Sequence, residues 1–114
     1  MKFSTIIIFG SEWKIFKDVE DDEVFEGDCA GYCDGFSKSI FIRKFSEKEL
    51  TGVKDIGSMQ RYILRHELIH AALLECGLGD NWYRTEMGHD ETAIDWLAHK
   101  FVQLYNIFEQ ADAI

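Results

Sequence analysis

A chain of 114 residues can bury one modest hydrophobic core, and we expect a single domain over residues 1–114. Hydrophobic residues make up 46% of the chain and aromatic residues 14%, a composition that excludes a disordered acidic tail. The formal net charge of −9 argues against binding to nucleic acids or to anionic membranes, since their phosphates would repel the protein.

The first predicted element is an apolar segment, Lys2–Phe9. Its run of isoleucines is too short for the hydrophobic region of a signal peptide and far too short to cross a membrane. We interpret this segment as a buried strand. The chain also has three cysteines, an odd number that suits a reducing cytosol better than a secreted disulfide framework, and this favours a cytoplasmic protein.

Further strands are predicted in the first half of the chain. Glu12–Val19 alternates, with Trp13, Ile15 and Val19 on one side, and Gly10-Ser11 before it is a predicted hairpin turn. The other features predicted in this half are a solvated acidic loop at Asp18–Glu23, an irregular stretch around Gly27, Gly31 and Gly35, a strand at Ser37–Arg43 and a capped helical turn at Ser46–Leu50.

The second half of the chain has the period of two helices. We expect the first to be capped by Ser58 and to end at Gly77, with one face formed by Met59, Tyr62, Ile63, His66, Ile69, His70, Leu73 and Leu74. The second begins near Asp90, with a stripe formed by Ile94, Leu97, Ala98, Phe101, Leu104, Tyr105 and Phe108. The sequence therefore predicts an α+β domain in which a small, antiparallel-rich sheet precedes two main helices.

The first predicted helix contains the letters HELIH, an H-E-x-x-H motif formed by His66, Glu67 and His70. Residues four apart lie one turn above each other on one helix face, so the two imidazoles can bind the same divalent ion. Glu67 projects about 100° round the helix from His66, where it flanks the ion and can deprotonate a water molecule. The alternative is a pair of half-buried histidines bonded to neighbouring residues, but burying two unpaired imidazoles beside a carboxylate costs free energy.

A catalytic zinc site needs a third protein ligand and an open fourth position. Glu91 follows His70 after twenty residues, at the start of the second predicted helix, and Asp95 lies one turn further on the same face. We expect Glu91 to bind the ion and Asp95 to accept a hydrogen bond from a ligand histidine. Two alternatives stay open: a solvated helix face for both carboxylates, and His89 as the third ligand. If Glu91 is the ligand, His89 becomes a candidate for stabilising a tetrahedral intermediate.

HELIH followed by ETAID, Glu91–Asp95, resembles the zincin metallopeptidases, in particular the gluzincin-like group that shares H-E-x-x-H and E-x-x-x-D. The size of the chain and its order of strands before helices resemble the minimal core of the ImmA/IrrE-type peptidases of phages and mobile elements. This resemblance covers the helical half of the chain, while the strand half matches only in kind. It implies a zincin-like fold and an exposed edge strand that pairs with the substrate, for which Ser37–Arg43 is our candidate.

The predicted function is that of a zinc-dependent endopeptidase that hydrolyses a peptide bond in a protein substrate, such as a repressor or another regulatory protein. Zinc held by His66, His70 and Glu91 would activate a water molecule, and Glu67 would serve as the general base. The alternative is a catalytically inactive zincin-fold binding module that acts on a protein partner. In either case we expect a peptide or protein partner, with no nucleic acid and no membrane.

Overall fold

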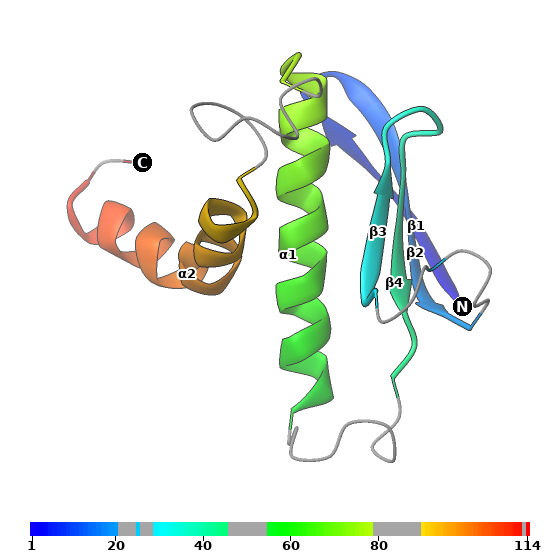
Figure 1. Ribbon diagram of the computed structural model, residues 1–114. Coiled ribbons are helices and arrows are strands. Elements are labelled where there is room, and N and C mark those ends of the chain that lie inside the picture. Colours follow the sequence, from blue (N-terminus) through cyan, green and yellow to red (C-terminus); the bar gives the residue numbers. More distant parts are fainter. Residues whose placement is uncertain (21–24, 26–28, 46–54, 79–89, 113) are drawn as a thin grey trace.

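The computed structural model describes residues 1–20, 25, 29–45, 55–78, 90–112 and 114, without the side chains of 107 and 108. Its elements are β1 (Lys2–Ile8), β2 (Ser11–Val19), β3 (Gly31–Asp34), β4 (Ser39–Arg43), α1 (Ile56–Glu75) and α2 (Glu91–Gln110). They form three layers, with α1 between the sheet and α2 (Figure 1). Neither of these two helices has the combination of length and apolar character that a membrane span needs.

The four strands form one mixed sheet in the order β1-β2-β4-β3. β1 and β2 are antiparallel, β3 and β4 are antiparallel, and β2 and β4 are parallel. The expected α+β class is confirmed, and the sheet has one parallel pairing among its three. Our prediction that Ser37–Arg43 is an edge strand is wrong, because β4 has a strand on each side and its Ile40 and Ile42 are fully buried. The edge on this side of the sheet is β3, a strand within the stretch predicted to be irregular.

The predicted hairpin between β1 and β2 is present, but its turn lies one residue earlier than expected. Ile8 faces Ser11, so the two loop residues are Phe9 and Gly10. Both have positive φ, 46° and 88°, as a type I′ turn requires. A type I′ turn matches the right-handed twist of the two strands. A turn at Gly10-Ser11 would instead shift the pairing of β1 with β2 by one residue. Ser11 is therefore the first residue of β2.

β1 is an exposed edge strand, so our interpretation of Lys2–Phe9 as a buried strand is wrong. Only Ile8 of β1 is buried, while Phe3 and Ile7 are 57% and 65% exposed. The physical reason is the position of the strand in the sheet. In the described part of the chain, β1 is paired on one side only and makes few contacts with α1, so the apolar run has little partner surface there.

The hydrophobic core lies between α1 and one face of the sheet. Trp13, Ile15 and Val19 of β2 are buried, as the alternation predicted. Trp13 and Ile15 join Ile40 and Ile42 of β4 in one cluster that packs against α1. Because the core lies on one face only, the sheet fixes the side of α1 that points inward.

α1 begins three residues earlier than expected. Its N-cap is Asp55, whose carboxylate accepts a hydrogen bond of 2.9 Å from the backbone N–H of Ser58, so the prediction of Ser58 as the cap is wrong. Its C-terminal end agrees with the sequence. Gly77 has φ 82°, and Gly77 and Leu78 donate backbone hydrogen bonds to Leu74 and Leu73, which is the Schellman arrangement.

The inward face of α1 is rotated relative to the predicted one. Its buried residues are Ile63, Glu67, His70 and Ala71, so a carboxylate and an imidazole occupy positions where a small domain usually places aliphatic side chains.

The predicted turn at Ser46–Leu50 and residues 21–23 of the predicted acidic loop lie outside the described residues. Asp18 and Val19, at the start of that loop, belong to β2.

The buried residues of α2, among those whose side chains the structure describes, lie in its first two turns. Ile94 and Ala98 are buried, as predicted, but Leu97, Phe101 and Tyr105 of the same predicted stripe are exposed. The helix runs away from α1, so its later turns leave the α1 surface (Figure 1). The part of α2 that packs is the part that carries Glu91 and Asp95.

Candidate metal centre

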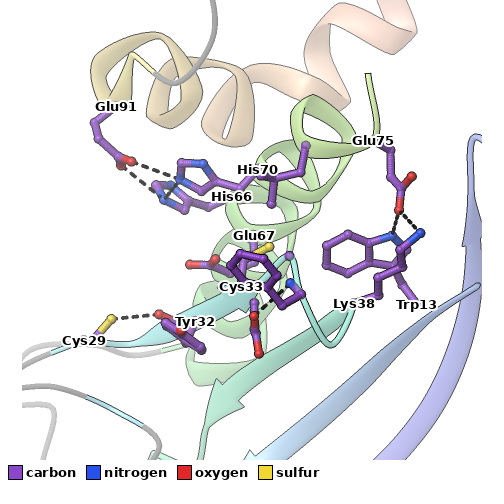
Figure 2. A pocket seen from close by; sticks show the side chains of 15 residues that line it. Trp13, Cys29, Tyr32, Cys33, Lys38, His66, Glu67, His70, Glu75 and Glu91 are labelled. Atoms are coloured by element: carbon purple, nitrogen blue, oxygen red, sulfur yellow. Dashed lines mark hydrogen bonds and ion pairs between the residues drawn. The ribbon is translucent and has the colours of Figure 1, made fainter. Parts of the chain in front are cut away.

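His66, His70 and Glu91 lie together where α1 and α2 meet, with one ligand atom from each within 4.8 Å of the others. Figure 2 shows the two imidazoles converging on the Glu91 carboxylate. The Nε2 atoms of the histidines are 3.2 Å apart. Glu91 Oε2 is 3.3 Å from His66 Nε2, and Glu91 Oε1 is 3.0 Å from His70 Nε2. The three predicted ligands therefore form one compact triangle.

The spacing of this triangle fits a tetrahedral zinc ion. With bonds of roughly 2.0–2.1 Å and tetrahedral angles, two ligand atoms are separated by about 3.3 Å. The separation of the two Nε2 atoms, and that of each Nε2 from a different Glu91 oxygen, lie between 3.0 and 3.3 Å. Two imidazole nitrogens and one carboxylate oxygen also form a typical protein ligand set for catalytic zinc. The side chain of His70 is only 4% exposed, whereas that of Glu91 is 57% exposed, so the triangle is reached from solvent on the Glu91 side.

Local sequence explains how the two helices present these atoms. His66 and His70 are one turn apart on α1, which places their rings at 4.8 Å centroid distance. Glu91 is the first residue of α2, because Asp90 caps the helix by accepting a 3.1 Å hydrogen bond from the Thr92 backbone N–H. Arg65 of α1 joins the two helices through a 2.7 Å hydrogen bond from Nε to the backbone carbonyl of Ala98.

Asp95 lies where the spacing from Glu91 predicted, beside His66, one of the candidate ligands. Its Oδ1 atom is 2.8 Å from His66 Nδ1, on the opposite side of the ring from Glu91. The same oxygen accepts a 3.1 Å hydrogen bond from the Tyr62 hydroxyl, and the Tyr62 ring stacks on His99 at 4.1 Å. With Nδ1–H donated to Asp95, His66 presents the Nε2 lone pair to the centre of the triangle.

We expect Asp95→Asn to weaken zinc binding by about 10- to 100-fold while leaving the fold intact, because an amide orients His66 less well than a carboxylate does. Tyr62→Phe removes only the hydroxyl bonded to Asp95 and should have a smaller effect. Competition with a chromophoric zinc chelator measures both affinities. Asp95→Asn binding zinc as tightly as the unsubstituted protein would contradict this role.

Glu67 is buried beside the triangle without being part of it. The residue is 7% exposed, and it lies next to His66 in sequence and one turn from the ring of His70. Burial raises the pKa of the Glu67 carboxyl to about 7; His66 opposes this rise and Glu91 adds to it. The carboxyl group therefore lines the same pocket as the three candidate ligands, in surroundings that strengthen its basicity.

Glu67 faces a groove of about 780 Å³ that runs along α1 beside β3. The candidate metal triangle lies at one end of the groove, and β3, the edge strand, forms one wall. Cys33 lines the groove near Glu67 (Figure 2). Burial, together with the charges of Glu67 and Asp34, raises the pKa of the Cys33 thiol to about 12. Cys33 is therefore a neutral wall residue rather than a nucleophile.

The other end of the groove is lined by a polar cluster from β2, α1 and the turn between β3 and β4. Glu75 Oε1 accepts a 2.7 Å hydrogen bond from the Trp13 indole and lies 3.1 Å from Lys38 Nζ. Lys38 Nζ also donates to the Ser11 hydroxyl at 2.9 Å. The hydrogen bond from Trp13, followed by that from Lys38, lowers the pKa of Glu75. This cluster ties the end of α1 to the sheet and thereby fixes the length of the groove.

Gly31 sets the distance between β3 and Glu67. A Cβ atom at this position would lie 2.9 Å from Ile63 Cγ2, 3.1 Å from Glu67 Cγ and 3.2 Å from Glu67 Oε1. We expect Gly31→Ala to lower the free energy of unfolding by about 1–3 kcal/mol, because a packed core must shift to admit the methyl group. Thermal or chemical denaturation measures the change.

Gly57 provides the matched control for this substitution. A Cβ there would meet only the tip of the flexible Arg61 side chain at 3.4 Å and Asp55 Oδ1 at 3.5 Å. Gly57→Ala in the first turn of α1 should therefore be neutral or stabilising by up to about 1 kcal/mol. Equal losses in both variants would show that the approach of β3 to α1 is less tight than these distances indicate.

The sequence identified His66, Glu67, His70, Glu91 and Asp95, and the structure brings all five together. His89, the rival third ligand, lies outside the described residues. The walls of the groove were missed. Gly31 lies in the stretch predicted to be irregular, because the alternation of a four-residue strand is too short to be recognised in one sequence.

No known protein family, curated protein or solved structure matches this chain. The residues and their geometry therefore carry the functional argument alone.

Proposed function

We propose that this protein is a zinc-dependent endopeptidase of the zincin type, with His66, His70 and Glu91 as zinc ligands and Glu67 as general base. The observation that carries the proposal is the cluster of His66, His70 and Glu91 beside a buried glutamate: one ligand atom from each of the three lies within 4.8 Å of the others, and each histidine Nε2 is 3.0–3.3 Å from a Glu91 oxygen. The H-E-x-x-H motif alone supplies two ligands and a base, whereas the third ligand comes from a different helix. Convergence of both helices on one point supports the metal site over a pair of core histidines.

The substrate is a peptide segment that binds in an extended conformation beside β3. Among the described residues, β3 is paired only with β4, and it lines the groove, so its other edge can add one more strand. A peptide bound there passes Glu67 and the candidate metal triangle, which line the same groove. This assignment replaces Ser37–Arg43 by Gly31–Asp34 as the substrate-binding edge.

Each residue of the site has a separate task in hydrolysis. When bound, a zinc ion supplies a Lewis acid that acidifies a water molecule and polarises a peptide carbonyl. Glu67 accepts the proton of the attacking water on a carboxylate oxygen and delivers it to the nitrogen of the leaving amine. Asp95 and Tyr62 hold His66 in orientation, and β3 holds the peptide backbone in register beside Glu67.

Metal content measured together with proteolysis tests the proposal. We expect about one zinc per purified chain, a ratio that follows from a single three-ligand site, and cleavage of a degenerate peptide library detected by mass spectrometry. A chelator should abolish cleavage, and added zinc should restore it. One zinc per chain without cleavage of any library peptide would favour the binding module with a structural ion. A folded protein that binds no zinc would contradict the proposal.

A further inference from the structure

β1 is an unusually apolar edge strand at the side of the sheet opposite the groove. It is seven residues long, and no strand lies beyond it in the part of the chain that the structure describes. Lys2 at its beginning is its only charged residue, and the first acidic residue of the chain is Glu12. Soluble proteins usually protect such an edge with prolines, inward charges or bulges. This strand has none of these, so a free β1 edge would be prone to pair.

The hairpin register determines which backbone groups of β1 are available. Alternate residues of an antiparallel strand direct their N–H and C=O groups to the same neighbour. Ile8 lies opposite Ser11 next to the two-residue turn, so Ile8 and every second residue before it face β2. The N–H and C=O groups of Phe3, Thr5 and Ile7 consequently point away from β2, toward the open edge.

We propose that two copies of this chain pair through β1 in antiparallel orientation, with Thr5 on the twofold axis. This register places Thr5 opposite Thr5 of the second copy and Phe3 opposite Ile7. The outward N–H and C=O groups of all three residues then form hydrogen bonds with the second copy. The interface is self-complementary, as a twofold axis requires. The result is a continuous eight-stranded sheet in which each copy keeps β3 and its groove at the outer edges.

Two features of the surface favour a second copy as the occupant of this edge. The first is charge: the chain has a net charge of −9, but residues 1–11 contain one lysine and no acid, so two copies can approach here with little repulsion.

The second feature is a row of aromatic rings on the sheet face away from α1. Phe3, Phe16, Phe41 and Tyr32 cross all four strands, with neighbouring centroids 5.2, 5.0 and 6.2 Å apart. In the proposed register, Phe3 continues this row onto Ile7 of the second copy as an aromatic–aliphatic cross-strand pair. The pairing therefore covers the two most exposed apolar side chains within β1.

Cysteine cross-linking tests the register directly in the full-length Cys76→Ser protein, which lacks the exposed native thiol. Directly opposite residues of an antiparallel pair have Cα atoms about 4.5–5.5 Å apart, within disulfide range. Thr5→Cys should therefore give roughly tenfold more covalent dimer under mild oxidation than its control, because pairing raises the effective thiol concentration. The control is Lys14→Cys, an exposed β2 residue directly beside Thr5. Three strand spacings, about 14 Å, would separate its two copies.

The mass of the protein in solution supplies an independent measurement. Light scattering should give twice the 13.2 kDa chain mass for the unsubstituted protein. Thr5→Pro should give a monomer with an unchanged circular dichroism spectrum, since the proline removes only an N–H that points away from β2. Thr5→Val, which keeps the N–H, should stay dimeric. A monomeric unsubstituted protein, or equal cross-linking of Thr5→Cys and Lys14→Cys, would overturn the proposal, because β1 would then not pair with β1 of a second copy.

Discussion

Glu67→Gln should reduce peptide hydrolysis by about 10²- to 10⁴-fold, the usual contribution of a positioned general base. The amide keeps the size of the side chain but cannot accept the proton of the attacking water. The substitution should leave both histidines and Glu91 in place, because Glu67 is beside the ligand triangle and not part of it. We therefore expect Glu67→Gln to retain one zinc per chain and the unsubstituted circular dichroism spectrum. A neutral amide also removes the cost of burying an ionised group, so the fold should not be weakened.

Glu109→Gln is the matched control for this prediction, since it makes the same chemical change on an exposed turn of α2, far along the helix from Glu91. It should keep full activity. Cleavage rates of a library-derived peptide, measured at saturating zinc, give the comparison. If Glu67→Gln cleaved the peptide at the rate of the unsubstituted protein, Glu67 would not be the general base, even if the zinc site were intact.

Replacing His70 or Glu91 by alanine should cost more zinc affinity than the roughly 10- to 100-fold expected for a ligand's hydrogen-bond partner such as Asp95. Each substitution removes one of the three residues whose ligand atoms lie within 4.8 Å of one another. Zinc binding to the folded state should also stabilise the unsubstituted protein, by about 2.7 kcal/mol when zinc is at a hundredfold excess over its Kd. Both variants should lose most of this stabilisation.

Elemental analysis and thermal denaturation with and without zinc measure these two effects. Thr92→Ala, next to Glu91 but outside the triangle, is the control and should bind zinc normally. If Glu91→Ala kept its zinc and its stabilisation, the third ligand would have to be sought elsewhere, beginning with His89. If His70→Ala kept both, the site itself would be misplaced.

The helical half of the site could be predicted from the sequence because its geometry is local. A spacing of four residues fixes the relative positions of His66 and His70, and the same spacing fixes Glu91 and Asp95. The packing of the two helices was not local, but the chemistry of the ligands narrowed the choice. It left Glu91 and His89 as candidate third ligands near the start of the next helix, and the structure places Glu91 beside both histidines.

The sheet could not be predicted in the same way, because strand order depends on pairing between distant segments. Alternation identified the inward side of Trp13 and Ile15, but it carries no information about which strand lies at an edge. Lys2–Phe9 looked like a buried strand because it is apolar, yet it is the outer strand of the sheet. Ser37–Arg43 looked like an edge, yet β4 is central. The apolar stripe of α2 was misleading for a related reason. Residues such as Leu97 and Phe101 have helical spacing, but this spacing does not show how much of the helix packs against α1.

X-ray absorption spectroscopy of the zinc-loaded protein tests the central claim most directly, because it reports the atoms bound to the ion. We expect a first shell of four nitrogen and oxygen atoms at about 2.0–2.1 Å with the multiple scattering of two imidazoles. That pattern should lose one imidazole in His70→Ala. A first shell containing sulfur at about 2.3 Å would place the ion on cysteines such as Cys29 and Cys33 and contradict a site built from His66, His70 and Glu91.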